Sequence, residues 1–251
     1  MLTVADVAVA FGGFQALRGV SLEAAAGTIV GIVGPNGSGK STLINVISGI
    51  QLPDRGVVRL DDRPVPLGRP DVVAAHGIGR TFQVPRLARR LTVLQNMLVG
   101  ARGQVGERLF PLFFSPRRVA ARERQIEAAA LAILRRLGLV AKSNDYAGGL
   151  SGGQQKLLSM GMLLMSDPGV LLLDEPAAGV NPVLIEQQVA FLAALRDEGR
   201  IILLVEHNME MVANLCDRVY VLDAGEVIAE GTPAAIRSDE TVMRSYLGQP
   251  A

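Results

Sequence analysis

The stretch GPNGSGKST, at residues 34–42, follows directly on the short apolar run TIVGIV at residues 28–33. Glycine allows the backbone to turn tightly and to come close to a ligand without a Cβ in the way. Lys40 stands at the expected start of a helix, where its positive charge opposes the helix dipole. Both features are explained if a strongly anionic group binds there, since the glycines let it approach the backbone and its charge offsets that of the lysine. The stretch therefore predicts an anion site where a strand is followed by a helix.

The same residues fit the pattern G-x-x-x-x-G-K-[ST] in full, in the strand-to-helix context that the pattern requires. The backbone N–H groups of residues 36–41 would converge on phosphate, Lys40 would reach the β- and γ-phosphates, and Ser41 would offer its hydroxyl to Mg²⁺. The alternative is a glycine-rich turn with a solvated lysine, and the context disfavours it. The predicted phosphate loop consists of Gly34, Pro35, Asn36, Gly37, Ser38, Gly39, Lys40, Ser41 and Thr42.

The bulk composition narrows the class of protein. A chain of 251 residues is long enough for one or two closely packed domains. Its formal net charge of +1 lacks the basic excess of nucleic-acid binders, so we expect no nucleic-acid partner. The single cysteine, Cys216, excludes an intrachain disulfide and suits a reducing compartment. No apolar run approaches the ~18–20 residues of a membrane span, and we expect no signal peptide, so the protein should face the cytosol.

Apolar periodicity predicts the fold class. The segments VLLLDEP, at 170–176, and IILLVEH, at 201–207, begin with continuous apolar runs that are typical of strands in a parallel sheet buried on both faces. Alternating stretches at 2–10 and 17–24 predict antiparallel strands ahead of the phosphate loop. The pattern of strands and helices indicates an α/β protein with a parallel core and a mainly helical insertion.

The expected helices and boundaries follow from cap and stop signals. Thr92, Ser151 and Asn181 are expected N-caps, and Gly138 is an expected stop. We expect a single domain over residues 1–251, with its core at about 1–89 and 166–251 and a helical subdomain at about 90–165. The expected segments are a helix at 40–50, a strand at 78–82, an irregular stretch at 100–118, a helix at 119–138, a helix from 181 to about 199, short strands at 218–222 and 226–230, and helices capped by Thr232 and Asp239.

An acidic pair ends the buried strand VLLLDEP, at residues 170–176. Ligands of open α/β sheets bind at the carboxyl ends of the strands, so both carboxylates are placed for chemistry. Asp174 would hold the Mg²⁺ shell, and Glu175 could polarise an attacking water. Alone, the pair could equally cap the next turn; combined with the phosphate loop it indicates a nucleotide hydrolase.

The segment LSGGQ, at residues 150–154, carries a capping pattern in Ser151 and Gln154 just before an apolar run. A well-capped helix is the plain interpretation. Two consecutive glycines, Gly152 and Gly153, would leave N–H groups exposed at the positive end of that helix, ready for a second anion contact. One ATP is not easily held by two helix starts of the same chain, which suggests a second subunit.

In this order, the phosphate loop, LSGGQ, a strand ending in DEP and then LVEH resemble the ATP-binding subunits of ABC transporters. The resemblance covers essentially the whole chain and implies a P-loop NTPase with a RecA-like parallel core, an antiparallel β subdomain and an inserted α-helical subdomain. It also implies a head-to-tail dimer, with ATP between Gly34–Thr42 of one subunit and Ser151–Gln154 of the other.

Further roles come from the resemblance alone. Gln83, in RTFQ, matches the glutamine that senses the γ-phosphate and metal and touches the transmembrane partner. His207 matches the histidine that contacts the γ-phosphate; without that context it would be interpreted as a core histidine. Phe11 matches the aromatic residue that stacks on adenine, and Phe14 is its rival, since any aromatic face can stack.

Within the family, GIGRTFQ, LTVLQNMLVG, AAGVNP and AEGTP…YLG are similar to importers of branched-chain amino acids, amides or urea. This resemblance implies a peripheral protein on the cytoplasmic face of the inner membrane, powering a separate permease with ATP and Mg²⁺. A homodimer or a heterodimer with a second ABC ATPase is expected, beside an extracytoplasmic solute-binding protein. The alternatives are a lipid or lipopolysaccharide export ATPase and a soluble ABC ATPase acting on DNA or ribosomes.

Three features are left open by the resemblance. Asn181 stands where the wider family often has aspartate, and Met162 where most members have arginine. The aromatic stretch FPLFF, at residues 110–114, could dock on a permease or on a sister ATPase, or pack inside the helical block. The transported solute is likewise not determined.

Overall fold

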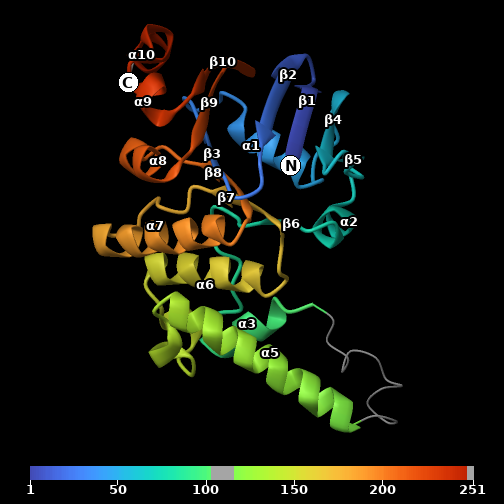
Figure 1. Ribbon diagram of the computed structural model, residues 1–251, viewed down its shortest axis with the longest axis vertical. Helices are drawn as coiled ribbons and strands as arrows, with labels where there is room; N and C mark the ends of the chain where they lie inside the picture. The colour runs from blue at the N-terminus through green and yellow to red at the C-terminus, as the bar shows by residue number, and fades with distance from the viewer. Residues whose placement is uncertain (103–115, 248–251) are drawn as a thin grey trace. The chain divides into compact units, whose positions relative to one another are not determined.

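The computed structural model describes residues 1–102 and 116–247, and these residues form two compact units (Figure 1). The first unit takes in the described residues of Met1–Gln83, Pro168–Ala178 and Leu192–Ala251. The second takes in those of Val84–Asp167 and Gly179–Phe191. The second unit is therefore inserted in the first along the sequence, and it includes a segment that follows the strand β7 (Val170–Asp174).

A six-stranded sheet forms the centre of the first unit, in the order β10-β9-β3-β8-β7-β6 (Figure 1). The strands from β9 to β6 pair in parallel, and β10 pairs antiparallel with β9. The predicted parallel core is confirmed. The strands are β3 (Ile29–Val33), β6 (Ile78–Arg80), β7 (Val170–Asp174), β8 (Ile201–Val205), β9 (Arg218–Asp223) and β10 (Glu226–Gly231).

The three central strands have no exposed face. Every residue of β3, β7 and β8 is buried. Parallel strands covered on both faces read as continuous apolar runs rather than alternating ones. This burial explains why IVGIV, VLLLD and IILLV carry their polar residues only at the carboxyl ends of the strands or just after them.

A second, antiparallel sheet belongs to the same unit, in the order β2-β1-β4-β5. Its strands alternate buried and exposed residues, as expected for a sheet with one face on a core. The helix α1 (Lys40–Ile47) shares one buried cluster with this sheet and with alternate residues of the parallel sheet. The strands are β1 (Leu2–Phe11), β2 (Phe14–Ala24), β4 (Arg55–Leu60) and β5 (Arg63–Pro64).

The helix α1 ends three residues before the expected Ile50. Gly49 adopts a left-handed φ of 75°, and the N–H of Ile50 returns to the carbonyl of Asn45. A glycine in this conformation terminates a helix because it satisfies the last carbonyls without a Cβ penalty. The strand expected at 78–82 is also shorter, since β6 ends at Arg80.

The second unit is built on α3 (Val93–Val99), α5 (Pro116–Arg136) and α6 (Gly152–Leu164), which contact one another (Figure 1). Thr92 caps α3 as predicted, with Gln95 completing the capping box. Short 3₁₀ turns follow at Val140–Lys142 and Ala147–Gly149.

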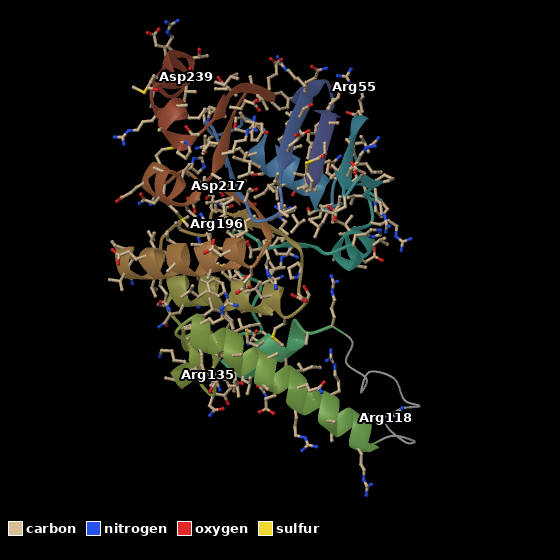
Figure 2. All side chains as sticks on the ribbon, in the orientation of Figure 1. Arg55, Arg118, Arg135, Arg196, Asp217 and Asp239 are labelled. Atoms are coloured by element: carbon tan, nitrogen blue, oxygen red, sulfur yellow. The ribbon has the colours of Figure 1, made fainter. Side chains whose placement is uncertain are left out.

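The expectation of an irregular stretch over 100–118 is wrong at its end, because α5 begins at Pro116. Proline is well suited to a first helical turn, where its missing N–H is not needed. Gly138, with φ 65°, follows the helix as predicted. Figure 2 labels Arg118 and Arg135, two of the exposed arginines of α5. The FPLFF stretch lies outside the described residues.

The helix α7 (Pro182–Asp197) begins in the second unit and ends in the first. Asn181 caps it by accepting a hydrogen bond from the N–H of Leu184 at 2.9 Å, which confirms the predicted cap. In the first unit, Arg196 at its end lies 3.8 Å from Asp217, and Asp217 accepts from the N–H of Ile29 (Figure 2). Asp217 therefore connects the end of α7 with Ile29, the first residue of β3.

The first unit also contains the helices α2 (Pro70–Ala75), α8 (Met209–Leu215), α9 (Pro233–Arg237) and α10 (Glu240–Leu247). Thr232 and Asp239 cap the helices that follow β10, as predicted. The sequence did not predict α2, α8 or the short strand β5. Along the part of the chain that the structure describes, no helix combines the length and apolar character needed to cross a bilayer.

Candidate functional site

The loop between β3 and α1 is shaped by glycines that no other residue could replace. Gly34 has φ 148°, and a Cβ there would lie 2.0 Å from the carbonyl oxygen of Leu222. Gly39 has φ 104°, and its Cβ would lie 2.6 Å from the carbonyl oxygen of Ala16. Both contacts are far below van der Waals separation, so the loop packs backbone against backbone.

The start of α1 leaves its first N–H groups without side-chain acceptors. Gly39 is the N-cap and provides no side-chain cap. The first hydrogen bond along the helix runs from the N–H of Leu43 to the carbonyl of Gly39, at 2.9 Å. The N–H groups of Lys40, Ser41 and Thr42 therefore precede the intrahelical ladder at the positive end of the helix dipole. Such a terminus is an anion-binding site.

Lys40 is held inside the loop rather than in solvent. Its side chain is 6% exposed overall, and Nζ donates to the carbonyl oxygens of Gly34 at 2.8 Å and Pro35 at 2.7 Å. Burial lowers the pKa of the ammonium from its ordinary value of 10.5, while the nearby carboxylates of Glu175 and Asp174 act in the opposite direction. The ammonium is thus fixed over the loop, which excludes the interpretation of a solvated lysine.

A pocket of about 280 Å³ lies over this loop. Both candidate aromatic residues line it, Phe11 at the end of β1 and Phe14 at the start of β2, opposite each other in the hairpin. Phe11 is 49% exposed and Phe14 is 64% exposed, so either ring face is accessible to a base. The other lining residues are Ala16, Asn36, Gly37, Gly39, Lys40, Ser41, Thr42, Glu175 and His207.

Glu175 is at the centre of a side-chain cluster at the end of β7. Its Oε2 accepts a hydrogen bond from Nε2 of Gln83 at 2.7 Å, and its Oε1 lies 3.1 Å from Nε2 of His207. The three residues come from three different loops, and the structure brings all of them together. Glu175 also has a left-handed φ of 49°, a backbone conformation that is uncommon for non-glycine residues.

Asp174 is almost fully buried, and its carboxylate pairs with Arg80 at 3.0 Å. Arg80 also donates to the side chains of Asn45 and Ser48 on and just after α1. Because β6 and β7 are parallel neighbours, Arg80 pairs with Leu172, two residues before Asp174. Arg80 was not predicted as a site residue; its place directly before TFQ was its only signal in the sequence.

Glu206 was also missed. It directly follows β8 and is 2% exposed. Its carboxylate accepts hydrogen bonds from the backbone N–H of Ala177 at 2.7 Å, of His207 at 3.1 Å and of Asn208 at 3.3 Å. An acid at the carboxyl end of a buried strand is the same signal that identified Asp174 and Glu175, so the sequence could have indicated it.

The LSGGQ residues belong to the second compact unit. Ser151 Oγ accepts from the N–H of Gln154, and Gln154 Oε1 accepts from the N–H of Ser151, so the predicted capping box is confirmed. Gly153 is buried, and a Cβ there would lie 2.8 Å from Leu184. Gly152 is exposed, and a Cβ there would meet nothing within 4 Å.

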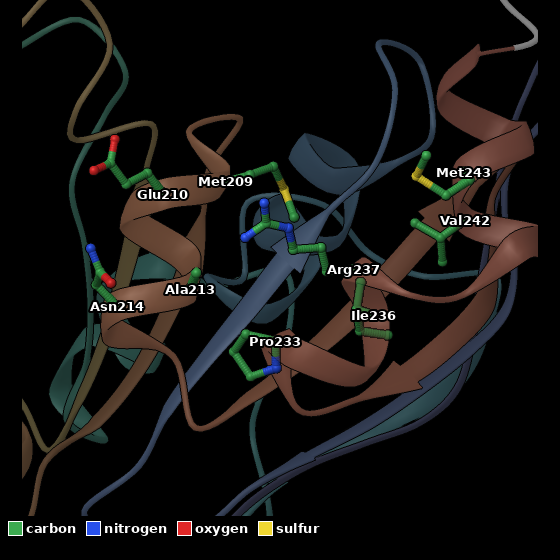
Figure 3. Close-up of a pocket in the computed structure, with 9 residues that line it drawn as sticks. All are labelled: Met209, Glu210, Ala213, Asn214, Pro233, Ile236, Arg237, Val242 and Met243. Atoms are coloured by element: carbon green, nitrogen blue, oxygen red, sulfur yellow. The ribbon is translucent and has the colours of Figure 1, made fainter.

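A larger pocket of about 630 Å³ is formed by α8, α9 and α10 (Figure 3). Figure 3 shows Met209 and Ala213 from α8 on one side and Val242 and Met243 from α10 on the other. Its walls are mainly apolar, with one carboxylate, Glu210, and one guanidinium, Arg237. It has no glycine-rich loop, so its features are not those of a phosphate site.

Comparisons with known proteins agree with this geometry. Residues 17–178 match the family model described as ABC transporter, and residues 226–251 match that of the branched-chain amino acid ATP-binding cassette transporter. The chain is 38% identical to the high-affinity branched-chain amino acid transport ATP-binding protein LivG of Salmonella typhimurium, over 99% of this chain and 98% of that protein. It is 34% identical to BraF of Pseudomonas aeruginosa, over the same shares of each chain.

Solved structures give the same picture. The crystal structure of a nucleotide-free ATP-binding cassette from an ABC transporter aligns with a TM-score of 0.86 at 37% identity, over 99% of both chains. The ADP conformation of MJ1267, another ATP-binding cassette of an ABC transporter, aligns with a TM-score of 0.85 at 35% identity, again over 99% of both chains. The predicted fold class is confirmed.

Proposed function

The chain belongs to the ABC transporter ATP-binding family, and from this premise we propose that it is the ATP-hydrolysing subunit of an importer for branched-chain amino acids. The observation that carries the substrate class is the match of residues 226–251 to a model of branched-chain amino acid cassettes. The full-length likeness to proteins named LivG and BraF supports the same class.

ATP is bound through backbone and ammonium contacts at the start of α1. The N–H groups of residues 36–41 donate hydrogen bonds to the phosphate oxygens, and Lys40 approaches the β- and γ-phosphates. Two features support this role. Gly39 provides no side-chain cap for the first N–H groups of α1, and Lys40 is buried at the loop. Phe11 stacks on the adenine ring, with Phe14 as the alternative in the same pocket.

Hydrolysis depends on Glu175. Its carboxylate orients and polarises the attacking water, while Gln83 and His207 hold its two oxygens and contact the γ-phosphate side of the site. Phosphoryl transfer needs little covalent chemistry from the protein, so catalysis consists of positioning and electrostatic stabilisation. The cluster around Glu175 supports this assignment, because Gln83 and His207 contact its carboxylate directly and fix its orientation.

The residues expected around Mg²⁺ have suitable donor chemistry. Ser41 offers a hydroxyl, Asp174 a carboxylate and Gln83 an amide oxygen, and Mg²⁺ prefers such hard oxygen ligands. When bound, the ion neutralises charge on the β- and γ-phosphate oxygens. To take part in the Mg²⁺ shell, Asp174 would give up its contact with Arg80.

The transport system needs further chains. A separate membrane permease is implied, since the family acts in transport. We propose a peripheral position on the cytoplasmic face of the membrane, and an extracytoplasmic binding protein that delivers the solute. The working ATPase is a head-to-tail dimer, with itself or with a second ABC ATPase. In that dimer, Ser151, Gly152, Gly153 and Gln154 of one subunit face the nucleotide of the other.

The experiment is reconstitution in proteoliposomes. The chain is combined with permease and binding-protein chains from the same genome, and ATP-driven movement of labelled leucine, acetamide and urea is measured in both directions. We expect leucine uptake that is abolished by Lys40→Ala. ATP-driven uptake of acetamide or urea without leucine would overturn the substrate class, and export would overturn import.

A further inference from the structure

We propose that Glu206 is a positioning residue for ATP hydrolysis, which holds the loop of Glu175 and the loop of His207 in one fixed arrangement. This inference rests on the proposed catalytic roles of Glu175 and His207. Glu206 is the first residue of the His207 loop, and this loop lies beside the Glu175 loop, because β7 and β8 are parallel neighbours with Asp174 paired to Val205. The residues that follow each strand therefore emerge side by side.

The carboxylate of Glu206 bridges these two loops. One oxygen, Oε1, accepts from the N–H of Ala177, two residues after Glu175. The other, Oε2, accepts from the N–H groups of His207 and Asn208. Within the residues that the structure describes, its partners are backbone amides and no basic side chain. Burying a carboxylate is costly unless it is fully hydrogen-bonded, and three amide donors meet that requirement.

The bridge restrains a strained turn. Glu175 has φ 49°, and its N–H bonds to the carbonyl of Val205 at 2.9 Å. A strained conformation of this kind persists only where the surroundings over-determine it. Glu206 supplies a second restraint, on Ala177, from the same neighbouring strand. Both ends of the 3.1 Å contact between Glu175 and His207 are thus fixed through one side chain.

The effect should be specific to turnover. Among the described residues, the hydrogen bonds of Glu206 go to Ala177, His207 and Asn208 and none to the phosphate loop, so we expect nucleotide affinity not to depend on it directly. A displacement of the catalytic groups by a fraction of an ångström to 1 Å is enough to reduce the rate about 10-fold to 100-fold. Glutamine has nearly the same shape as glutamate, but one acceptor oxygen is replaced by a donor. In either orientation of the amide, an NH₂ group then faces a backbone N–H.

The test compares Glu206→Gln with the wild type and with Glu210→Gln, an exposed acid on α8, as matched control. We expect kcat for ATP to fall about 10-fold to 100-fold in Glu206→Gln, with KM close to wild type. The unfolding temperature should fall by a few degrees, because one buried N–H loses its acceptor. In a His207→Ala background, the same substitution should lower kcat by a smaller factor. The bond from Ala177 still restrains the Glu175 loop, but the His207 end of the bridge no longer has a side chain to position. Equal losses in both backgrounds, or a wild-type kcat, would overturn the proposal.

A spectroscopic measurement separates positioning from folding. The chain has two histidines, His76 and His207, so the imidazole proton resonances are easily assigned. In Glu206→Gln, the His207 resonance should move while that of His76 stays in place. If Glu206→Gln is unfolded, Glu206→Asp is used, since it keeps the charge but shortens the reach. Loss of the native His76 resonance in both variants would assign Glu206 a purely structural role.

The same set of proteins tests the premise separately. Wild-type turnover in Glu175→Gln would remove Glu175 from its proposed role, whatever Glu206 does. Loss of turnover in Glu175→Gln together with full turnover in Glu206→Gln would overturn only the positioning role.

Discussion

Oε1 of Glu175 lies 3.1 Å from Nε2 of His207, although 32 residues separate them in the sequence and each follows a different strand. Gln83 reaches the other oxygen of the same carboxylate at 2.7 Å. Three residues with proposed roles at the γ-phosphate thus form one cluster. The carboxylate is held by partners on both oxygens, as expected of a base that has to direct a water molecule.

Replacing Glu175 by glutamine should remove the proposed base and keep the shape. We expect kcat for ATP hydrolysis to fall about 10²–10⁴-fold, the usual contribution of a general base. ATP affinity should be retained, and the ATP-bound protein should accumulate as a dimer. Turnover is measured by phosphate release and the dimer by light scattering. The control is Glu240→Gln, whose side chain is 86% exposed. Turnover near wild type in Glu175→Gln would contradict the assignment.

The buried position of Lys40 predicts a pH dependence of ATP binding. Burial lowers its pKa from 10.5 in the free protein, and the bound triphosphate would raise that pKa again. A group with the higher pKa in the complex strengthens binding only while it is protonated. Affinity should therefore be complete below the free-protein pKa and decline as the pH rises through the interval between the two values.

This decline is measured by isothermal titration from pH 8 upward, at constant ionic strength. The control is Lys40→Arg, because a guanidinium stays protonated over the whole range. Whatever affinity that variant retains should be independent of pH. An equally steep decline in Lys40→Arg would show that another group is responsible.

The phosphate loop, the acidic pair after β7 and the caps at Thr92, Ser151 and Asn181 were predicted because each signal is local. A motif or a cap depends on residues within a few positions, and its geometry follows from them. The parallel sheet was predicted for a related reason. Five consecutive buried residues in each of β3, β7 and β8 leave a continuous apolar run in the sequence.

The contacts that complete the site are long-range and were not predicted. Arg80 meets Asp174 across 94 residues, through the pairing of β6 with β7. The carboxylate of Glu206 reaches Ala177 across 29 residues, through the pairing of β7 with β8. Both depend on the order and register of strands, which no single stretch of sequence specifies. The early end of α1 had a local signal in Gly49, but the apolar Ile50 outweighed it.

The two aromatic residues of the proposed nucleotide pocket can be distinguished by a pair of substitutions. Stacking of a base on an aromatic side chain contributes about 1–3 kcal/mol, so removing the stacking ring should weaken ATP binding about 5-fold to 150-fold. We expect this loss for Phe11→Ala and a small change for Phe14→Ala. Each variant is the control for the other, since both rings line the same pocket. The reverse result would assign stacking to Phe14, and no change in either would exclude both.

Gly152 offers a test of the facing subunit that is independent of folding. It is exposed, and a Cβ at this position would meet nothing within 4 Å, so Gly152→Ala should leave the stability of the single chain unchanged or slightly raised. In the proposed dimer, however, the first turn of α6 lies against the nucleotide of the other subunit, and a methyl group would separate them. We therefore expect ATP turnover to fall about 10-fold or more, through loss of closely positioned contacts.

Gly149→Ala is the matched control, because that glycine is also exposed and without neighbours within 4 Å. Gly153→Ala serves as the opposite case, since its Cβ would collide with Leu184 and lower the unfolding temperature. Full turnover in Gly152→Ala would mean that the LSGGQ segment only caps a helix, and the two-subunit site would have to be abandoned.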